Sequence, residues 1–420
     1  MLEEFLSYIQ EDLIVSIDDK MLLAVSGGVD SMVMLQLFRH SSFQFEVAHV
    51  DHSTREGAST EDAQFVLEYC RSHGMICHLT QLDYAKLSAG NFQNNARNER
   101  YRFFDLILHE RNMQFVVTAH HMDDRWETFV THLNRKAGLT GLTSLRPQSD
   151  KRLRPLLQFT KQQILSYAIE QGIPHRHDRS NDEDNYQRNK IRHHIQPAIE
   201  AVFPEFVRNV NASINHLQSS SAIIDEMIEI LGLVDRGTST AYTVVDLAQI
   251  KAMSNNLNIM HHIMSGKGFT ASDSRDILSC HTTGAMFYST EYEALVDRDK
   301  VLLRKRSQVI RNFIKIEKTG QYTLQDGRTV IVGTRHDIQK ASNICIVTDL
   351  EIGEQIIIRS IEPGDRYYPE HMNGKSKSVK KYLTDHKVSR FDKELVLVVL
   401  KEGKLIDVIM PAKSTILDIT

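Results

Sequence analysis

The amino-acid sequence predicts an α/β fold: a parallel sheet with helices on both faces, then a helical extension and two smaller C-terminal modules. Between residues 21 and 138, short apolar runs alternate with longer amphipathic runs, which is the pattern of strands joined by crossover helices. The first strand meets its helix at two consecutive glycines, Gly27 and Gly28. Beyond residue 310 the apolar runs are short and strand-like, which favours a β-rich ending.

The first third of the chain contains four expected strand–helix pairs. The strands are expected at 21–25, 43–50, 75–82 and 114–120, and the helices at 32–38, 59–74, 91–112 and 123–138. Ligands of such folds bind at the carboxyl ends of the parallel strands. Ser26, His49 and His120 fall at these ends, so we expect the functional site there.

Three domains are expected along the chain. Residues 160–232 read as helices interrupted by prolines, and we assign 1–215 to a catalytic domain with a helical extension. Short polar turns then indicate a small mixed domain at 216–306. Strand-like runs such as "RTVIVG", "QIIIRSI" and "ELVLVVL" predict a β-rich module at 310–420.

Composition excludes several classes of protein. The chain has 420 residues, 41% hydrophobic content, four scattered cysteines and a net charge of −4. The cysteines fit neither a C-x-x-C metal site nor a disulfide framework. No apolar run is long enough to span a bilayer, and the acidic N-terminus is unlike a signal peptide. We therefore expect a cytoplasmic protein without membrane contacts, in which any nucleic-acid binding depends on local basic patches.

The stretch "SGGVDS" predicts a nucleotide site. Glycines in a strand-to-helix turn let backbone N–H groups approach an anion, whereas Asp30 would repel a phosphate unless it held a divalent cation. The loop lacks the G-K-[ST] ending of the Walker motif and the third glycine of the dinucleotide motif. It resembles the PP-loop of the ATP pyrophosphatases. The resemblance implies that ATP is bound by Ser26, Gly27, Gly28, Val29, Asp30 and Ser31, with Mg²⁺ on Asp30.

The stretch "TAHHMDDRWET" concentrates His120, His121, Asp123, Asp124 and Glu127 at a strand-to-helix junction. Together with the neighbouring "HVDH" (His49, Asp51 and His52), it leaves a binuclear metallo-phosphohydrolase as an alternative. Asp124 and Glu127 are three residues apart and therefore share one helix face. Two carboxylates so placed can hold an ammonium group and help it lose a proton.

Two further groups of basic residues are candidates. Arg97 and Arg100 share a helix face near the strand ends, where a guanidinium can hold a carboxylate or a pyrophosphate. Arg188, Lys190 and Arg192 follow an acidic stretch, and their spacing fits either a solvated surface helix or a contact with an anionic partner.

The order of these motifs resembles that in the tRNA(Ile)-lysidine synthetases. The shared stretches are "SGGVDS", "HVDHSTREGASTEDAQFV", "NFQNNARNERY", "TAHHMDDRWET", "LRPLL", "DRSNDEDNYQRNKIR" and "IEPGDRYYPEHMNGKSKSVKKYLTDHKVSR". They cover about 20–210 and 355–391. The family implies a ligase that uses ATP to adenylate the wobble cytidine of a tRNA(Ile) with a CAU anticodon. Adenylation releases pyrophosphate, and free L-lysine then displaces AMP. The modified tRNA decodes AUA instead of AUG.

The resemblance also implies residue roles. Arg100, Asp124 and Glu127 match positions that bind lysine, and with Asp30 they are the catalytic candidates. We expect tRNA contacts from the 216–306 domain, from Arg188, Lys190 and Arg192, and from Lys380 and Lys381 within "GKSKSVKKYLTDHKVSR". A homodimer is a further hypothesis. The chain departs from the family pattern at Asp51, Arg125, Trp126, Ile361 and Glu362.

A tRNA thiolase of the same fold is the nearest rival. Such an enzyme would normally carry catalytic cysteines or a C-x-x-C cluster near the ATP site, and Cys70 and Cys77 are not so placed in the sequence.

Overall fold

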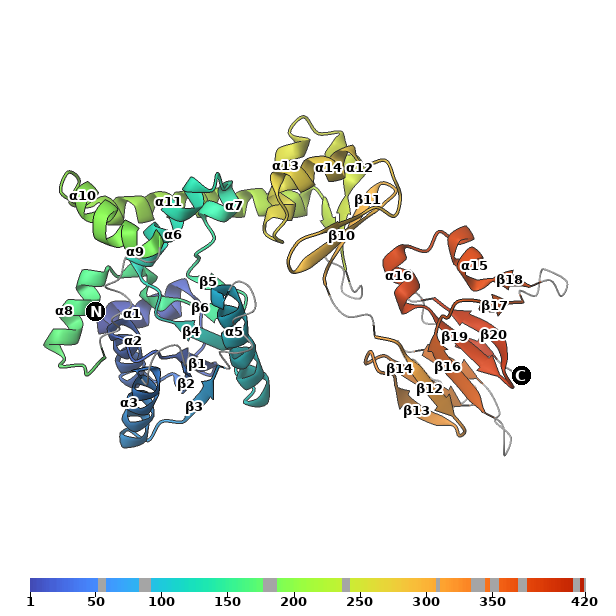
Figure 1. Ribbon diagram of the computed structural model, residues 1–420, viewed down its shortest axis with the longest axis horizontal. Coiled ribbons are helices and arrows are strands. Elements are labelled where there is room, and N and C mark those ends of the chain that lie inside the picture. Colours follow the sequence, from blue (N-terminus) through green and yellow to red (C-terminus); the bar gives the residue numbers. More distant parts are fainter. Residues whose placement is uncertain are drawn as a thin grey trace. The chain divides into compact units, whose positions relative to one another are not determined.

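The computed structural model describes residues 1–51, 58–82, 92–176, 187–235, 242–306, 310–333, 344–347, 355–368, 376–410 and 416–418. The chain forms two compact units, Met1–Asp225 and Glu226–Thr420 (Figure 1). The boundary falls within helix α11, and the three expected domain ranges stay predictions.

A six-stranded sheet forms the centre of the first unit. Its order is β3-β2-β1-β4-β6-β5, with β1 at Lys20–Ala24, β2 at Gln44–Asp51, β3 at Cys77–Gln81, β4 at Phe115–Thr118, β5 at Gln148–Ser149 and β6 at Arg152–Leu153. Every pairing is parallel except β5 with β6. The expected parallel sheet is therefore confirmed. Because the chain runs outward from β1 to β3 and returns on the other side at β4, the carboxyl ends of β1 and β4 flank the switch point of the sheet.

Helices cover both faces of this sheet, as Figure 1 shows. They are α1 (Leu2–Ser7) with a π-helical turn at Tyr8–Asp12, α2 (Val29–Arg39), α3 (Ala58–Ser72), α5 (Phe92–Glu110) and α8 (Lys161–Glu170). Helix α6 (Met122–Asn134) follows β4 and packs with the helical extension. Strand β1 explains the arrangement, because alternate side chains point to opposite faces. Met21 and Leu23 pack in the cluster that contains α2, whereas Leu22 packs in the cluster that contains α5.

A helical extension completes the first unit, as expected. It consists of α7 (Leu139–Leu142), a 3-10 turn (Pro155–Gln158), α9 (Gln187–Lys190), a π-helical turn (Ile191–Ile195), α10 (Gln196–Glu200) and α11 (Phe206–Ile230). Trp126 of α6 packs with Ile191 and Val207, and Asn211 Nδ2 donates to the Met122 carbonyl at 3.1 Å. These contacts hold α11 and the π-helical turn after α9 against α6.

The second unit begins with a five-stranded sheet of order β7-β8-β11-β10-β9. Its elements are β7 (Val234–Asp235), β8 (Thr243–Asp246), α12 (Leu247–Lys251), α13 (Asn256–Ser265), α14 (Ala271–Ser279), β9 (Met286–Tyr288), β10 (Tyr292–Asp297) and β11 (Lys300–Lys305). Buried residues of the strands and helices form one cluster, so this part is the mixed α and β region that the sequence predicts.

The rest of the second unit is rich in strands. The four-stranded sheet β12-β16-β19-β20 comprises Phe313–Ile316, Ile356–Ser360, Leu397–Lys401 and Lys404–Ile409. A second sheet, β13-β14-β15-β21, comprises Gly320–Thr323, Thr329–Gly333, Ile344–Val347 and Ile416–Asp418. A two-stranded ribbon pairs β17 (Arg366–Tyr367) with β18 (Lys377–Ser378).

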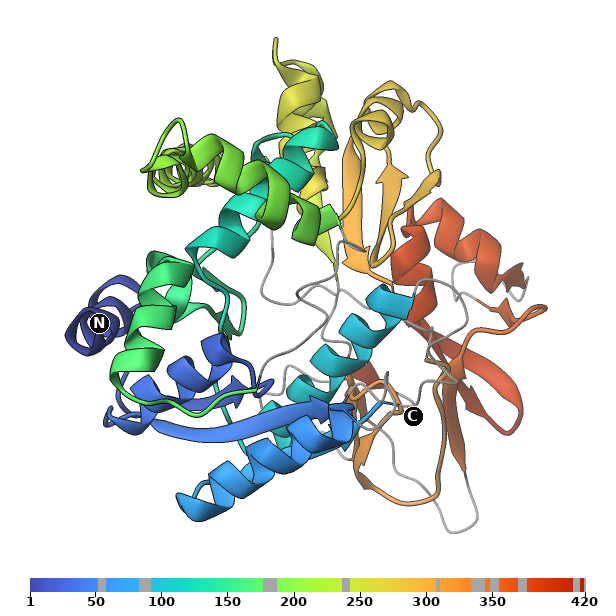
Figure 2. The same cartoon turned by 60° about the vertical axis from the view of Figure 1, so that its left-hand side comes forward.

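Helices α15 (Val379–Asp385) and α16 (Arg390–Leu395) lie together beside the β16, β19 and β20 strands (Figure 2). Val379 and Leu383 of α15 pack with residues of β19 and β20. Phe391 of α16 is fully buried and packs with Leu295 and Leu302 of the five-stranded sheet. In the described part of the chain, no helix is long and apolar enough to cross a membrane.

Candidate functional site

The glycine loop after β1 is held in a fixed conformation. Gly27 has a φ of +91°, which favours glycine, and its carbonyl accepts a hydrogen bond from the Arg176 backbone at 2.9 Å. Gly28 is the N-cap of α2. Ser31 Oγ accepts from the Ser26 N–H at 3.1 Å and donates to the Gly28 carbonyl at 2.9 Å. The first N–H groups of α2 have no partner within the helix, so the loop presents donors where an anion would sit.

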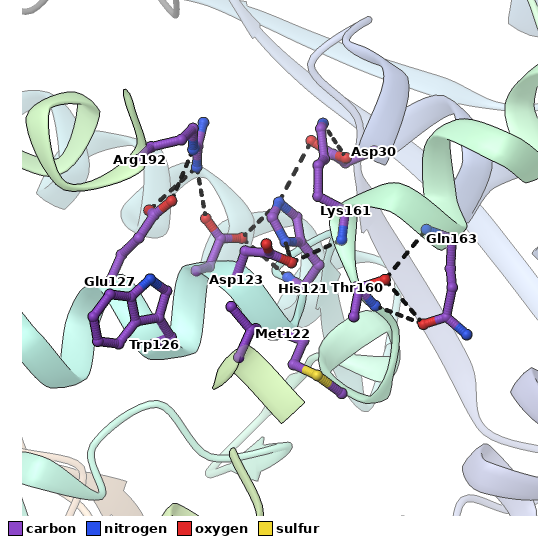
Figure 3. Close-up of polar contacts among 12 residues, drawn as sticks. Asp30, His121, Met122, Asp123, Trp126, Glu127, Thr160, Lys161, Gln163 and Arg192 are labelled. Atoms are coloured by element: carbon purple, nitrogen blue, oxygen red, sulfur yellow. Dashed lines mark hydrogen bonds and ion pairs between the residues drawn. The ribbon is translucent and has the colours of Figure 1, made fainter. Parts of the chain in front are cut away.

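Asp30 lies in the first turn of α2 and is paired with Lys161, the first residue of α8. Asp30 Oδ1 is 2.6 Å from Lys161 Nζ (Figure 3). The start of α8 is fixed by a capping box, because Thr160 Oγ1 accepts from the Gln163 N–H at 3.3 Å and Gln163 Oε1 accepts from the Thr160 N–H at 2.9 Å. Lys161 therefore brings a cation to the loop from 131 residues away in sequence.

His121 links the loop to the carboxylates of α6 (Figure 3). Its ring lies 4.0 Å from Asp30 Oδ2, 3.4 Å from Asp123 Oδ2 and 3.5 Å from Asp124 Oδ2. Burial alone would lower the pKa of His121, but the negative charges of Asp124 and Asp123 outweigh it, and the pKa is raised. The acidic groups from α2 and α6 thus favour the protonated form of His121, which lies between them.

Asp123 has a structural role in this arrangement. Its Oδ2 accepts a hydrogen bond from the Lys161 backbone at 2.7 Å, and its Oδ1 accepts one from Gln196 Nε2 at 2.9 Å. Both oxygens are therefore used to join α6 to α8 and α10.

Asp124 and Glu127 share one face of α6, as expected, and two arginines cover that face. Glu127 is fully buried; its Oε2 accepts from Arg188 Nε at 2.8 Å and its Oε1 from Arg192 Nε at 2.7 Å. Asp124 Oδ2 accepts from the His121 N–H at 3.0 Å. Asp124 Oδ1 lies 3.4 Å from Arg188 and 3.6 Å from Arg192, too far for good hydrogen bonds.

These surroundings move the two carboxyl pKa values in opposite directions. Burial raises the pKa of Glu127 more than Arg192 and Arg188 lower it. Burial would also raise the pKa of Asp124, but His121, His120 and Arg188 hold it well below its usual range. Asp124 is therefore a fixed negative charge at any physiological pH.

Two of the three residues expected to contact tRNA on α9 and the π-helical turn after it are paired within the chain. The guanidinium groups of Arg188 and Arg192 pair with Glu127, whereas Lys190 is exposed. A phosphate contact by either arginine would compete with these ion pairs. Their assignment to tRNA stays a prediction.

Arg100 and His120 border the same edge of the sheet. Arg100 of α5 is half-buried, and burial together with nearby Arg97 lowers its pKa. His120 Nδ1 lies 2.9 Å from Thr118 Oγ1, and burial lowers the pKa of His120 to about 4. His120 is thus neutral at pH 7.

The described residues do not assemble the metal cluster of the alternative hypothesis. Among them, no group of three or more histidine, cysteine or acidic residues is placed to hold a metal ion. His49 instead places its Nδ1 2.8 Å from the Val25 carbonyl, and Asp51 is buried at the end of β2. His52 lies outside the described residues.

Two of the positions that depart from the family pattern are structural. Arg125 is buried and donates to Gln218 Oε1 of α11 at 2.6 Å. Trp126 Nε1 donates to Gln196 Oε1 at 3.2 Å, and its ring packs edge-on against Phe206 at 4.9 Å between centroids. Both side chains hold the helical extension rather than face the glycine loop.

The C-terminal basic stretch is partly paired. Lys377 forms an ion pair with Asp385, whereas Lys380 and Lys381 are exposed on α15; Lys375 lies outside the described residues. In the preceding P-G-D turn, Asp365 accepts from Arg359 NH1 at 2.9 Å and NH2 at 2.7 Å. This Asp fixes the turn before the ribbon.

Sequence reasoning missed Lys161 and Gln196. A signal for Lys161 was present: "TKQQ" follows "LRPLLQF" and has the S/T-x-x-E/Q pattern of a helix start, which places Lys161 in a first helical turn. No local pattern indicates the contact of Gln196 with Asp123.

Two family profiles match the chain. Residues 2–199 match a family described as "PP-loop domain", and residues 238–306 match one described as "TilS substrate binding domain". A tRNA(Ile)-lysidine synthase of Bacteroides thetaiotaomicron is 29% identical over 93% of this chain and 90% of its own length. One of Chlorobaculum tepidum is 33% identical over 54% of this chain and 70% of its own length.

Solved structures give more distant matches. The U34-tRNA thiolase NcsA of Methanococcus maripaludis, solved with its [4Fe-4S] cluster, aligns with a TM-score of 0.44 and 17% identity over 51% of this chain and 77% of its own. The NH3-dependent NAD synthetase of Campylobacter jejuni aligns with a TM-score of 0.31 and 17% identity, covering 52% of this chain and 90% of its own.

Proposed function

This chain belongs to the tRNA(Ile)-lysidine synthase family, and we propose that it uses ATP to join free L-lysine to the wobble cytidine of a tRNA(Ile) with a CAU anticodon. One observation carries the proposal. The glycine loop with Asp30 and the carboxylate of Asp124 meet at the carboxyl ends of the adjacent strands β1 and β4, linked through His121. Glu127 follows one turn after Asp124 on the same face of α6. Nucleotide and amine would therefore meet at one edge of the sheet.

The first step is adenylation of the cytidine. The carbonyl oxygen of the base attacks the α-phosphorus of ATP, and the bond to the β-phosphate oxygen breaks to release pyrophosphate. The N–H groups at the start of α2 would hold the phosphates in this step. The carbonyl oxygen of the cytosine has then become part of a leaving group.

The donor set beside the loop fits Mg²⁺. This ion takes one or two carboxylates together with phosphate oxygens, and Asp30 Oδ2 has its charged neighbour, His121 Nε2, only at 4.0 Å. Asp30 would hold the ion, which when bound would neutralise charge on the polyphosphate.

The second step needs the side-chain ε-amine of lysine in its neutral form. The free amine has a pKa of about 10.4, so the site must bind an ammonium group and remove its proton. The two carboxylates differ in what they offer. Asp124 Oδ1 accepts no hydrogen bond from the residues that the structure describes and stays ionised, which suits it to bind the ammonium. Both oxygens of Glu127 accept hydrogen bonds from arginines. Glu127 would therefore accept a proton from the lysine amine only after Arg188 or Arg192 moves away.

The remaining contacts follow from charge. Arg100 makes no ion pair within the described part of the chain and would take the α-carboxylate of lysine or a phosphate. The neutral amine attacks the activated ring carbon, the bond to the adenylated oxygen breaks, and AMP leaves. Arg188, Lys190 and Arg192 in the first unit and Lys380 and Lys381 in the second would contact phosphates of the tRNA.

A single assay tests the proposal. The protein is incubated with ATP, radiolabelled lysine and a tRNA with a CAU anticodon, and label in the RNA and release of AMP are both measured. A tRNA that differs only in the wobble nucleotide is the control. Label that enters both RNAs equally, or AMP release without label in RNA, would contradict the proposal. Light scattering of the same sample tests the hypothesis of a homodimer.

A further inference from the structure

Three guanidinium groups gather around the ring of Tyr101 in α5. The Cζ atom of Arg152, from β6, lies 3.9 Å from the ring centroid. Those of Arg97 and Arg100, from α5 itself, lie at 5.3 and 5.6 Å. Residues from two elements separated by about fifty positions in sequence thus place like charges side by side.

No acidic group balances these charges within the described ranges. The side chains of Arg97, Arg100 and Arg152 form no ion pair or hydrogen bond with any described residue, whereas Arg102 on the same helix as Arg97 pairs with Glu99 at 3.7 Å. Unbalanced positive charges on neighbouring groups repel one another, so holding them together makes the free energy of folding less favourable.

A fourth arginine lies behind them. Arg154 is 5% exposed. Its NH1 donates to the Arg146 carbonyl at 2.6 Å and to Ser149 Oγ at 3.0 Å, but its Nε has no partner. Burial lowers the pKa of Arg154, and Arg152 and Arg97 add to this effect. Such perturbed groups are typical of binding sites.

Arg152 and Arg154 lie on the opposite side of β4 from the glycine loop, whereas Arg97 and Arg100 lie on α5, which packs against both β1 and β4. In the sheet, β4 separates β6 from β1, and the glycine loop follows β1. His120, at the end of β4, feels the charges of Arg154, Arg188 and Arg97. The arginines therefore lie near the end of β4, from which α6 with its carboxylates follows.

We propose that Arg97 and Arg152, supported by Arg154 and set around Tyr101, bind a backbone phosphate of the RNA next to the nucleotide that is modified. This inference rests on the proposed function, in which RNA is a substrate. A free lysine has one α-carboxylate, which a single bidentate guanidinium such as Arg100 satisfies. Pyrophosphate leaves beside β1. A polyanion with repeated phosphates is the ligand that matches several exposed or half-exposed arginines without counter-charges.

The test compares charge-neutralising variants on one helix and its neighbouring strand. Arg97→Gln and Arg152→Gln are each measured for affinity to the CAU-anticodon tRNA over a range of salt concentrations. Arg102→Gln is the matched control, because Arg102 lies on α5 and is 77% exposed, and its replacement by Gln removes the same charge. Binding of ATP and of free lysine is measured by calorimetry on every variant.

We expect Arg97→Gln and Arg152→Gln each to bind tRNA about three- to tenfold more weakly, with a salt slope smaller by about 0.7 to 0.9 for each phosphate that the variant no longer neutralises. Arg102→Gln should match the wild type, and ATP and lysine affinities should not change. An equal loss in Arg102→Gln, no loss in any variant, or a loss confined to ATP or lysine would overturn the inference.

Two further measurements separate the possible failures. If Arg152→Gln lowers the melting temperature, two other variants still test the phosphate site. Arg152→Lys keeps the positive charge on β6, and Arg97→Gln changes an exposed side chain. Lysine incorporation by the wild type decides the proposed function by itself. A wild type that binds tRNA but incorporates no lysine would refute that function and leave the phosphate site standing if the arginine variants still lose affinity.

Discussion

Lys161 Nζ lies 2.6 Å from Asp30 Oδ1, so the first residue of α8 is ion-paired with the first turn of α2. The two side chains are 30% and 29% exposed. Water screens a pair of this exposure, and its contribution to stability is about 0 to 1 kcal/mol. The pair is therefore weak enough for either side chain to take a ligand in its place.

The first prediction concerns Asp30→Asn. Loss of the charge should reduce tRNA-dependent AMP formation by at least about a hundredfold, because the loop would lose its carboxylate for the cation that accompanies ATP. The melting temperature should change by only a few degrees, since the pair with Lys161 is screened. Asp18→Asn, at an exposed position before β1, is the control. Turnover of Asp30→Asn equal to that of the control would contradict the role.

The second prediction separates Glu127 from Asp124. Glu127→Gln removes the buried carboxylate that accepts hydrogen bonds from Arg188 and Arg192. Because these arginines are 44% and 30% exposed and can be solvated, we expect a loss of unfolding free energy of about 1 to 3 kcal/mol in addition to impaired lysine transfer. Asp124→Asn should raise the apparent KM for lysine, and it should also lower stability, because His121, His120 and Arg188 hold the pKa of Asp124 well below its usual range. Chemical denaturation and lysine titration measure the two effects. If Glu127→Gln were as stable as the wild type, the ion pairs with α9 would not form in solution.

These two sites show what the sequence could and could not predict. The SGGVDS loop and the Asp124–Glu127 face depend on residues within one turn or one helix, and local spacing was enough to predict both. The partners of these residues depend on tertiary contacts. Arg188 is 61 residues from Glu127, and Lys161 is 131 residues from Asp30. Spacing along the chain does not indicate which part of the helical extension packs on α6. The burial of Glu127 and its pairing with Arg188 and Arg192 therefore could not be predicted from the sequence.

The third prediction compares two neighbouring glycines. Gly27 has a φ of +91°, and a Cβ there would lie 3.4 Å from Val66 Cγ2, so Gly27→Ala should cost about 1 to 3 kcal/mol of unfolding free energy. Gly28 has a φ of −72°, and its Cβ would meet only Ser26 Oγ at 3.5 Å. Gly28→Ala should therefore leave stability within about 1 kcal/mol of the wild type. Urea denaturation of both variants checks this, and equal losses would show that the loop conformation differs.

The fourth prediction concerns pH. The pKa of His120 falls from 6.5 to about 4 because the ring is buried, so the unfolded chain binds a proton there more readily than the folded one. Stability from this group is complete above pH 6.5 and is lost as the pH falls toward 4, by at most about 3 kcal/mol.

His120→Asn should remove that part of the pH dependence. Because the raised pKa of His121 acts in the opposite direction, the informative quantity is the difference between wild type and variant, measured by denaturation at several pH values. His109→Asn, on the exposed side of α5, is the control. A constant difference between wild type and His120→Asn from pH 4 to pH 7 would rule out the proposed titration.

The last prediction concerns α15, where the exposed Lys380 and Lys381 lie on a chain whose net charge is −4. A solvated helix is the simpler interpretation of two exposed lysines, and charge alone does not exclude it. A slightly acidic protein that binds a polyanion must, however, collect its phosphate contacts in local patches. Lys377 is already paired with Asp385, which leaves these two as the available cations of α15 itself.

Reversing both charges, Lys380→Glu with Lys381→Glu, should weaken tRNA binding at least tenfold, reduce the salt dependence of binding and raise the apparent KM for tRNA. The affinities for ATP and free lysine should stay unchanged, because the first unit carries the residues assigned to them. The double reversal of Lys315 and Lys318, exposed at β12 and the turn after it, changes the net charge by the same amount and is the control. If both double variants lose the same affinity at low salt, the loss reflects overall charge, and α15 has no specific part in positioning the RNA.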